Sequence, residues 1–183
     1  KNHSRLAHLN DGIALVNFFC WLEKQNLKEN LDEFQVAKKL EELRKLNKNF
    51  FSLSFPTISA SGSNASIIHY TPNKKSNKLS SGALYLCDSG AQYYGATTDV
   101  TRTVLLGKAK ANDEYINLYS KVLLGHVNIS MLKFPVGTKG SQIDVLGRYN
   151  LWNSGLDYNH GTGHGVGSFL SVHEGPQNIS KNW

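Results

Sequence analysis

The stretch DSGAQYYGATTDVTRT, residues 88–103, joins two β-type runs and decides the architecture. The run ALYLCDS, 83–89, leads into it and DVTRTVLL, 99–106, ends it, so the sequence predicts strand, connection, strand. Asp88 lies at the end of the first strand and Asp99 at the start of the second. If the strands are antiparallel neighbours, the two carboxylates lie on one face, about 5 Å apart across the pair.

Two ionised carboxylates at such a distance repel each other, and one pKa rises unless a cation lies between them. The ordinary alternative is a pair of turn-capping aspartates, which Asp88-Ser89-Gly90 taken alone favours. Residues 88–103 by themselves leave both interpretations open.

A second segment, HGTGHGVGSFLSVHE at 160–174, favours a metal site. Its first eight residues include four glycines, which lets backbone and imidazole approach a ligand closely. Carboxylates with neutral imidazole are a ligand set for Mn²⁺, Co²⁺, Fe²⁺ or Zn²⁺. Two acids that bridge a pair of ions about 3.5–4 Å apart would form a dinuclear hydrolase centre, with a bridging hydroxide as nucleophile.

Composition excludes several classes of protein. The 183 residues suit one globular domain over 1–183, with 40% hydrophobic and 19% charged residues. The net charge of +6 comes without a basic stripe carrying interleaved aromatics, so no nucleic-acid partner is expected. No apolar run reaches the roughly 18–20 residues of a membrane span, and the N-terminus lacks the apolar core of a secretory signal. Cys20 and Cys87 are expected to be free, buried thiols, which favours a cytoplasmic protein.

The remaining elements are predicted from periodicity. Helices are expected at 4–26, largely buried, at 32–47, at 112–133 with Asn112 or Asp113 as cap, and at 140–152. The patches FSLSF and SIIHY are of β type, and ISASGSNAS between them has the composition of a loop. This order is α+β, without the alternation of a dinucleotide-binding fold.

The motifs DSGAQYYGATTDVTRT, HGTGHGVGSFLSVHEGP and IIHY together closely resemble the Xaa-Pro aminopeptidase (aminopeptidase P) family. The resemblance runs from HLNDGIALVNFFCWLEK, 8–24, to HEGP, 173–176. It implies the pita-bread fold shared with prolidase, creatinase and methionine aminopeptidase. It also implies a metallopeptidase that releases the N-terminal residue from peptides with proline second, through a metal-bridging hydroxide.

The resemblance further implies a role for six residues. The implied metal ligands are Asp88, Asp99 and His164. The implied substrate-side histidines are His69, His160 and His173. Asp99 resembles the bridging ligand, and His173 is the preferred residue for polarising the scissile carbonyl. The implied cofactors are two divalent ions, Mn²⁺ first with Zn²⁺ or Co²⁺ as alternatives. The implied partners are the peptide substrate and, for the full-length protein, a second copy in a homodimer.

The family's site has five protein ligands, and the last two are glutamates downstream of HEGP. Because the chain stops at Trp183, we expect a fold incomplete at its C-terminal strands and a chain that is, at this length, inactive or weakly active. Glu174 belongs to HEGP and is not expected to replace a missing ligand. Ala96, where a glycine is common, and a His69–Asp88 spacing one residue short are departures that affect no ligand.

Two alternatives to the aminopeptidase remain. The first is a prolidase-type dipeptidase, which the wording HGTGHGVGSFLSVHEGP disfavours. The second is a non-catalytic pita-bread protein that serves in binding. Such proteins lose their metal ligands, whereas this sequence keeps Asp88, Asp99 and His164.

Overall fold

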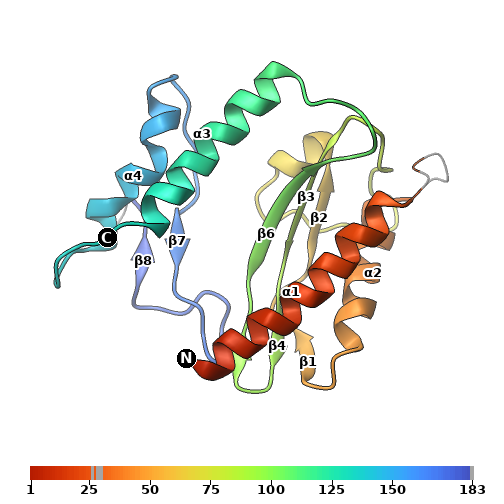
Figure 1. Cartoon of the computed structure of the whole chain (residues 1–183), viewed down its shortest axis with the longest axis horizontal. Coiled ribbons are helices and arrows are strands. Elements are labelled where there is room, and N and C mark those ends of the chain that lie inside the picture. Colours follow the sequence, from red (N-terminus) through yellow and green to blue (C-terminus); the bar gives the residue numbers. More distant parts are fainter. Residues whose placement is uncertain (26, 28–30, 182–183) are drawn as a thin grey trace. The chain divides into compact units, whose positions relative to one another are not determined.

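The computed structural model describes residues 1–25, 27 and 31–181 (Figure 1). These residues form two compact units. Unit 1 comprises Lys1–Lys110 with Val166–Val172, and unit 2 comprises Ala111–Gly165 with the described residues from His173 onward. The single domain over 1–183 stays a prediction. Within the described part of the chain, every helix is too short or too polar to cross a membrane.

Unit 1 begins with helix α1, Asn2–Glu23, which confirms the helix predicted over 4–26; residue 26 lies outside the described residues. The prediction that this helix is largely buried is wrong. Its inner side is buried and its outer side is exposed by 52–63%, because the apolar residues surround the helix while the sheet and α2 cover one side of it. The buried apolar residues are Ala7, Ala14, Leu15, Phe18 and Leu22. The exposed apolar residues are Leu6, Leu9, Ile13 and Val16. Cys20 is a free thiol as predicted, but it is exposed.

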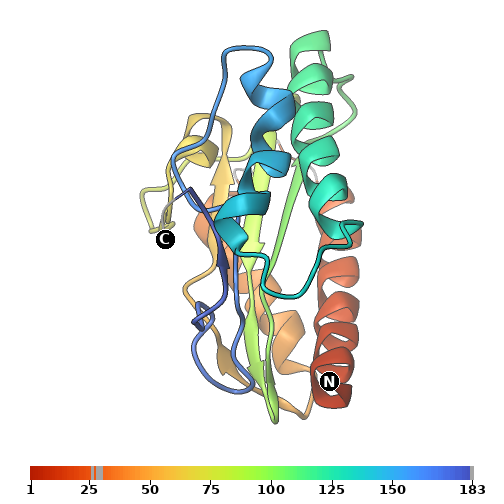
Figure 2. The same ribbon diagram turned by 90° about the vertical axis from the view of Figure 1, so that its left-hand side faces the viewer.

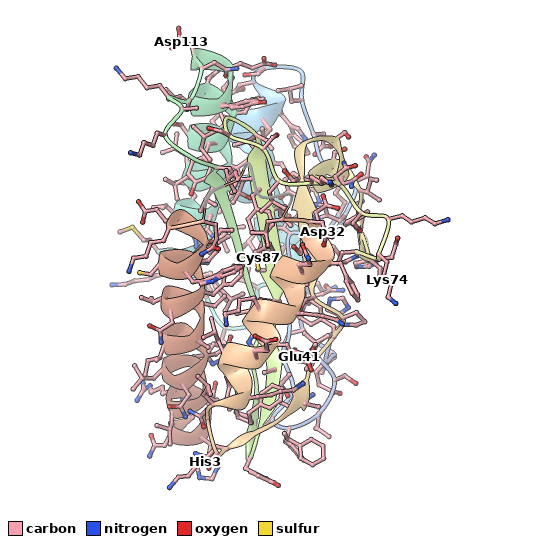
Figure 3. The ribbon with its side chains drawn as sticks, turned by 90° about the vertical axis from the view of Figure 1, so that its right-hand side faces the viewer. His3, Asp32, Glu41, Lys74, Cys87 and Asp113 are labelled. Atoms are coloured by element: carbon pink, nitrogen blue, oxygen red, sulfur yellow. The ribbon has the colours of Figure 1, made fainter. Side chains whose placement is uncertain are left out.

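Helix α2, Glu33–Lys45, confirms the helix predicted over 32–47. Its N-terminus is closed by a capping box: the Gln35 amide donates to Asp32 Oδ1 at 2.8 Å, and the Asp32 amide donates to Gln35 Oε1 at 3.0 Å. Figure 3 shows α2 face on, with Asp32 at its start and Glu41 further along. Val36 and Leu40 are fully buried on the opposite side.

The sheet that carries the predicted strand pair has the order β2-β3-β6. Strand β3, Leu84–Ser89, is antiparallel to β6, Val100–Leu105, which confirms the strand–connection–strand prediction. The connection itself folds into two short strands, β4 (Ala91–Tyr93) and β5 (Ala96–Thr97). They form a second sheet with β1, Phe50–Leu53, in the order β1-β4-β5.

The region between β1 and β3 departs from the prediction. ISAS is strand β2, Ile58–Ser61, followed by the 3-10 helix η1, Gly62–Ser66, whereas SIIHY forms no strand. Serine and alanine have the composition of a loop, but here their small size lets β2 pack tightly in the sheet. Ser59 is fully buried and its hydroxyl is 2.8 Å from the Tyr85 hydroxyl.

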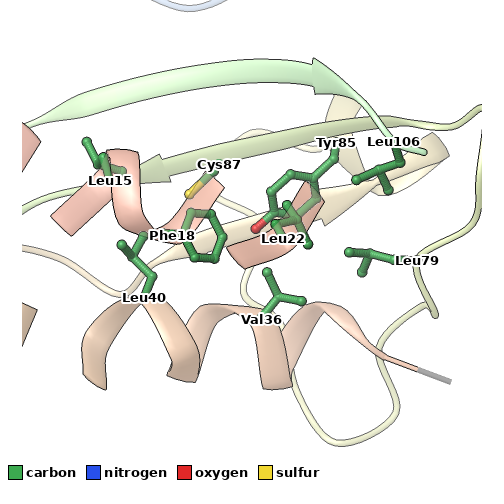
Figure 4. Close-up of a cluster of buried hydrophobic side chains, with 9 residues drawn as sticks. All are labelled: Leu15, Phe18, Leu22, Val36, Leu40, Leu79, Tyr85, Cys87 and Leu106. Atoms are coloured by element: carbon green, nitrogen blue, oxygen red, sulfur yellow. The ribbon is translucent and has the colours of Figure 1, made fainter. Parts of the chain in front are cut away.

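The main core lies between the helices and one face of β3 (Figure 4). Phe18 of α1 and Leu40 of α2 pack there with Tyr85 and Cys87 of β3. Burying a side chain such as Phe18 contributes about 1.5–3 kcal/mol. Successive side chains of a strand point to opposite faces, so Asp88 lies on the face of β3 away from this core.

Unit 2 contains helices α3, Asp113–Ser130, and α4, Gly140–Trp152, which lie side by side (Figure 2). Both confirm predicted helices, and Asn112 is the cap, accepting from the Tyr115 amide at 2.8 Å. The helices meet at glycines: a Cβ on Gly125 would lie 2.2 Å from the Gly147 carbonyl oxygen. The contact therefore lies at Gly125, whereas Val122, one turn earlier on the same helix, is 55% exposed. Strands β7, Gly163–His164, and β8, Asn178–Ile179, complete the unit.

Candidate active site

The strand register in unit 1 defines how the two aspartates lie. Asp88 is opposite Thr101, and Ser89 is opposite Val100. Asp99 precedes Thr101 by two residues and is therefore a diagonal neighbour of Asp88 on the same face of the sheet. The predicted direct pairing becomes a diagonal one, for which Cα atoms are about 7–8 Å apart and the side chains remain within reach.

The environment of one Asp88 oxygen indicates that this side chain can bind a cation. Its Oδ1 is buried and has no hydrogen-bond partner among the described residues. A buried carboxylate oxygen without a partner costs several kcal/mol, on the order of a lost charge-assisted hydrogen bond or more. A divalent ion shared with Asp99 would satisfy that oxygen, and carboxylates are ligands such ions prefer. The residues present thus fit a metal site.

Gly90 of the DSG motif permits the close approach of the two chain segments. A Cβ at this position would lie 1.9 Å from the Thr98 carbonyl oxygen and 2.4 Å from Ser54 Oγ. The Ala91 amide donates to Thr98 Oγ1 at 2.9 Å, and the Thr98 amide donates to the Ala91 carbonyl at 2.9 Å. This ladder sets Asp99 one residue beyond Thr98, beside the end of β3.

A buried ion pair, which the sequence analysis missed, supports the strand from its helix-facing side. Arg44 donates to Asp11 through Nε at 2.7 Å and through one terminal nitrogen at 3.0 Å, and both side chains are fully buried. The same terminal nitrogen donates to Ser89 Oγ at 3.0 Å. Tyr93 donates to Asp11 at 3.0 Å, and burial together with the Asp11 charge raises the pKa of Tyr93. The residue next to Asp88 is thereby fixed to both helices.

His69 lies in an exposed loop of unit 1 and has a left-handed backbone, φ 56°. The next residue anchors this loop, because the Tyr70 hydroxyl donates to Glu33 Oε2 at 2.6 Å. Glu33 is fully buried and also accepts from the Ser61 amide at 2.6 Å and from the Asn64 side chain. This anchoring role was not predicted from the sequence.

In unit 2, His164 and His173 lie together, with ring centroids 4.2 Å apart at an interplanar angle of 72°. Glycine makes this possible: a Cβ on Gly165 would lie 2.1 Å from the Glu174 carbonyl oxygen, and the Glu174 amide donates to the Gly165 carbonyl at 2.9 Å. His164 Nδ1 lies 2.8 Å from the Gly165 carbonyl oxygen, so this nitrogen carries the proton. Nε2 is then the lone-pair nitrogen, as in most metal-binding histidines.

His160 lies at the start of the same segment and is exposed, with Nδ1 2.7 Å from the Gly161 carbonyl oxygen. The preceding loop is held by Arg148 of α4, which pairs with Asp144 at 2.7 Å and with Asp157 at 2.9 Å. Lys181 and Arg148 hold the pKa of Asp157 well below its usual range. Asp144 and Arg148 are separated by four residues on a predicted helix, so the i,i+4 rule was a signal that could have found this pair.

A carboxylate oxygen that is buried and has no hydrogen-bond donor among the described residues, next to a second aspartate, fits the metal-binding site of an enzyme domain. The class defined by fold and site is thus an α+β metallohydrolase domain. The chain belongs to metallopeptidase family M24, whose sequence profile matches residues 4–183. Its fold is the pita-bread fold of that family, as predicted.

Relatives of known name agree with this. The chain is 52% identical over 178 residues to the probable Xaa-Pro aminopeptidase P of Fusarium vanettenii, a match that covers 96% of this chain and 28% of that protein. It is 45% identical to the crystal structure of an X-prolyl aminopeptidase from Caenorhabditis elegans, with a TM-score of 0.93 over all of this chain and 30% of the other. The prolidase of Pyrococcus horikoshii is 28% identical, with a TM-score of 0.81 over 96% of this chain and 47% of the other.

Proposed function

We propose that the full-length protein is a metal-dependent aminopeptidase that removes the N-terminal residue from peptides with proline in the second position. The 52% identity to a probable Xaa-Pro aminopeptidase P supports this, although the chain spans less than a third of that relative's length. The C. elegans enzyme, 45% identical, is described as cytosolic, with a di-nuclear active site. The observation that carries the proposal is the buried Oδ1 of Asp88, which has no hydrogen-bond partner in the part of the chain that the structure describes.

The proposed metal ligands in this chain are Asp88, Asp99 and His164. Bound ions, Mn²⁺ first with Zn²⁺ or Co²⁺ as alternatives, would polarise the peptide carbonyl and lower the pKa of water. Asp88 would offer its buried oxygen, Asp99 a second carboxylate on the same face, and His164 its Nε2. The donation from His164 Nδ1 to the Gly165 carbonyl would hold the ring in the tautomer that binding requires.

The substrate-side roles are proposed for three histidines. His173 would donate a hydrogen bond to the scissile carbonyl oxygen, where negative charge develops in the transition state. The edge-to-face contact with His164 supports this role because it fixes the orientation of both rings. His69 and His160, both exposed, would orient the peptide or transfer protons.

Prolidase is the competing enzymatic function, and substrate length separates the two. The higher identity and TM-score of the aminopeptidase structure, 45% and 0.93 against 28% and 0.81, favour the aminopeptidase. The full-length protein should therefore cleave a peptide of the Arg-Pro-Pro type and leave an Ala-Pro dipeptide almost uncleaved. A preference for the dipeptide would assign it as a prolidase instead, and loss of both activities would favour a binding protein.

The test of the metal site is Asp99→Asn in the full-length protein. This change removes one carboxylate from the ligand set, so Mn²⁺-dependent cleavage of an Arg-Pro-Pro type peptide should be abolished. The matched control is Asp113→Asn, which changes an exposed aspartate in the first turn of α3 and should leave the rate unchanged. Undiminished activity of the Asp99 variant would refute the assignment.

Location and assembly complete the proposal. The described cytosolic location of the C. elegans enzyme supports a cytosolic location for this protein. The proposed partner is the Xaa-Pro peptide substrate. The homodimer of the full-length protein stays a prediction, which its mass by light scattering would decide.

A further inference from the structure

Three side chains of unit 2 form a stack that ends at His160. The Arg148 guanidinium lies over the Tyr158 ring, with its carbon 3.9 Å from the ring centroid. The Tyr158 ring in turn stacks on the His160 imidazole, with centroids 4.7 Å apart and an interplanar angle of 26°. His160, which is proposed to act on the substrate, is thus stacked on the aromatic ring of Tyr158.

The base of this stack is rigid. Arg148 is 1% exposed, and each of its guanidinium nitrogens has an acceptor. Besides its two aspartates, it donates to the Tyr158 carbonyl at 2.6 Å and to the His160 carbonyl at 2.9 Å. The residue that supports the Tyr158 ring from below therefore also fixes the backbone of both residues above it.

The middle of the stack is fixed at its outer end. Thr162 donates its hydroxyl hydrogen to Asp144 Oδ1 at 2.6 Å. Its oxygen then accepts from the Tyr158 hydroxyl, which lies 2.5 Å away. The Tyr158 ring is thus held by Arg148, and its hydroxyl is held by Thr162, which is itself bonded to Asp144.

The top of the stack is exposed to solvent, although His160 Nδ1 lies 2.7 Å from the carbonyl oxygen of the neighbouring Gly161. The His160 side chain is exposed, and the four residues that follow it include two glycines. An exposed side chain in such a segment ordinarily samples several rotamers, and holding it costs entropy. A parallel stack on a fixed aromatic ring restricts that sampling, at a strength of about 0.5–1.5 kcal/mol for ring pairs.

We propose that Tyr158 is a positioning residue for His160: the Arg148–Tyr158–His160 stack holds the imidazole in the orientation from which it acts on the peptide. This rests on the proposed function, in which His160 is a substrate-side histidine. Tyr158 itself has no proposed contact with substrate or metal. Misplacement of a substrate-orienting group by about 1 Å can cost up to a hundredfold in rate, so this support matters for catalysis.

The experiment is a double-mutant cycle in the full-length, metal-loaded protein with an Arg-Pro-Pro type peptide. Tyr158→Leu removes the aromatic ring beneath His160 and should lower kcat/KM about tenfold, within the range that misplacement of His160 allows. Tyr158→Phe keeps the ring and should stay within about threefold of the unmodified protein. Tyr149→Leu is the matched control, because Tyr149 lies on the same helix as Arg148 but is 56% exposed.

The decisive comparison uses His160→Ala. If Tyr158 acts through His160, adding Tyr158→Leu to His160→Ala should lower kcat/KM by less than about twofold more, because coupled residues are not additive. Multiplying effects, or a Tyr158→Leu variant as active as the unmodified protein, would overturn the proposal. Metal content should be the same in all variants, since a general structural failure would reduce it.

A structural readout keeps the inference separate from the activity. A crystal structure of the Tyr158→Leu variant should show the His160 ring in more than one rotamer, and that of the Tyr158→Phe variant should show one. A single, unchanged His160 orientation without the aromatic ring would overturn the proposal. If the unmodified protein cleaves no Xaa-Pro peptide, the proposed function fails, and the rotamer comparison still decides whether the stack positions His160.

Discussion

The aspartate segment, 83–105, and the histidine segment, 157–174, carry the proposed site residues on opposite kinds of scaffold. Buried and partly buried side chains alternate regularly along strand β3, and Tyr85, Cys87 and Ser89 are buried against the helices. In contrast, no residue from 157 to 174 is buried. The first segment is held by apolar packing on one face, whereas the start of the second, residues 157–162, is held by a network of charged and polar groups around Arg148. A regular strand leaves its opposite face available for ligands, whereas an irregular segment needs its backbone held at several points.

Each segment has its own buried Arg–Asp pair, and the pairs differ in what they support. Arg44 donates only to side chains, Asp11 and Ser89, while its remaining terminal nitrogen has no partner among the described residues. Arg148 donates to carbonyl oxygens of the loop as well as to aspartates. The Arg44–Asp11 pair therefore adds to an apolar core that already holds β3. The Arg148–Asp144 pair instead holds a loop that has no apolar core of its own.

The largest expected effect comes from removing one partner of each pair. Arg44→Met should cost about 3–5 kcal/mol of unfolding free energy, because Asp11 stays buried without its cation. Arg148→Met should cost a similar amount and also release the loop. Hydrogen exchange measured by mass spectrometry on the full-length protein separates the two.

In the Arg148 variant, the Thr162 and Gly165 amides, which donate to Ile179 and Gln177, should lose protection. In the Arg44 variant, the amides of β3 should remain protected in the native state. If the loop amides of the Arg148 variant stay protected, the claim that Arg148 holds this loop is wrong, since the loop would then have another support.

A smaller effect is expected from filling the two glycine contacts. Gly90→Ala and Gly165→Ala would each place a Cβ about 2 Å from a backbone oxygen, 1.9 Å from Thr98 and 2.1 Å from Glu174. Overpacking of this kind costs about 1–3 kcal/mol, and thermal unfolding of the full-length variants measures it.

Gly12→Ala is the control for this pair of variants. Gly12 lies within α1, and a Cβ there meets nothing within 4 Å. Alanine should therefore stabilise the helix by about 0.5–1 kcal/mol. Equal behaviour of all three variants would mean that the two contacts are not structural constraints.

The sequence predicts the aspartate segment better than the histidine segment, for a physical reason. Alternation is a local pattern, so β3 and β6 follow from ALYLCDS and DVTRTVLL. The burial of Ser59 in β2 depends on Tyr85, 26 residues away, and the Arg44–Asp11 pair spans 33 residues. Such contacts leave no local pattern, which is why the strand ISAS looks like a loop by composition alone.

The candidate site follows the same rule. Its six residues were predicted from motifs and their resemblance to a family, and their roles stay predictions. The glycines of the histidine motif were predicted to let a ligand approach closely, which stays a prediction, whereas the structure shows that a Cβ at Gly165, and likewise at Gly90, would meet backbone atoms. The supports behind the site residues, such as Glu33 beneath the His69 loop, needed the fold.

The smallest expected effect concerns the helix-facing side of β3. Burial raises the pKa of the Cys87 thiol from its ordinary 9.0 to about 11. The folded state therefore disfavours the thiolate, so this contribution to stability is present below pH 9.0 and is lost as pH rises through about 11.

Alkylation at pH 8 reports on the same environment. Cys20 is exposed and should react within minutes, while Cys87 should react only when the protein unfolds. Mass spectrometry of the alkylated full-length protein locates the label. Rapid labelling of Cys87 in the native state would show that the face behind Asp88 is open to solvent, which contradicts its burial between β3 and the helices.

The buried oxygen of Asp88 offers the sharpest test of the proposed metal site. Crystals of the full-length protein grown with Mn²⁺ allow the position of the ion to be read from anomalous scattering. We expect an ion within about 2.0–2.2 Å of Asp88 Oδ1, a distance typical of carboxylate ligands, and the same ion or a second one on Asp99. A hydrogen-bond donor on that oxygen, with no ion bound to Asp88, would show that Asp88 is not a metal ligand.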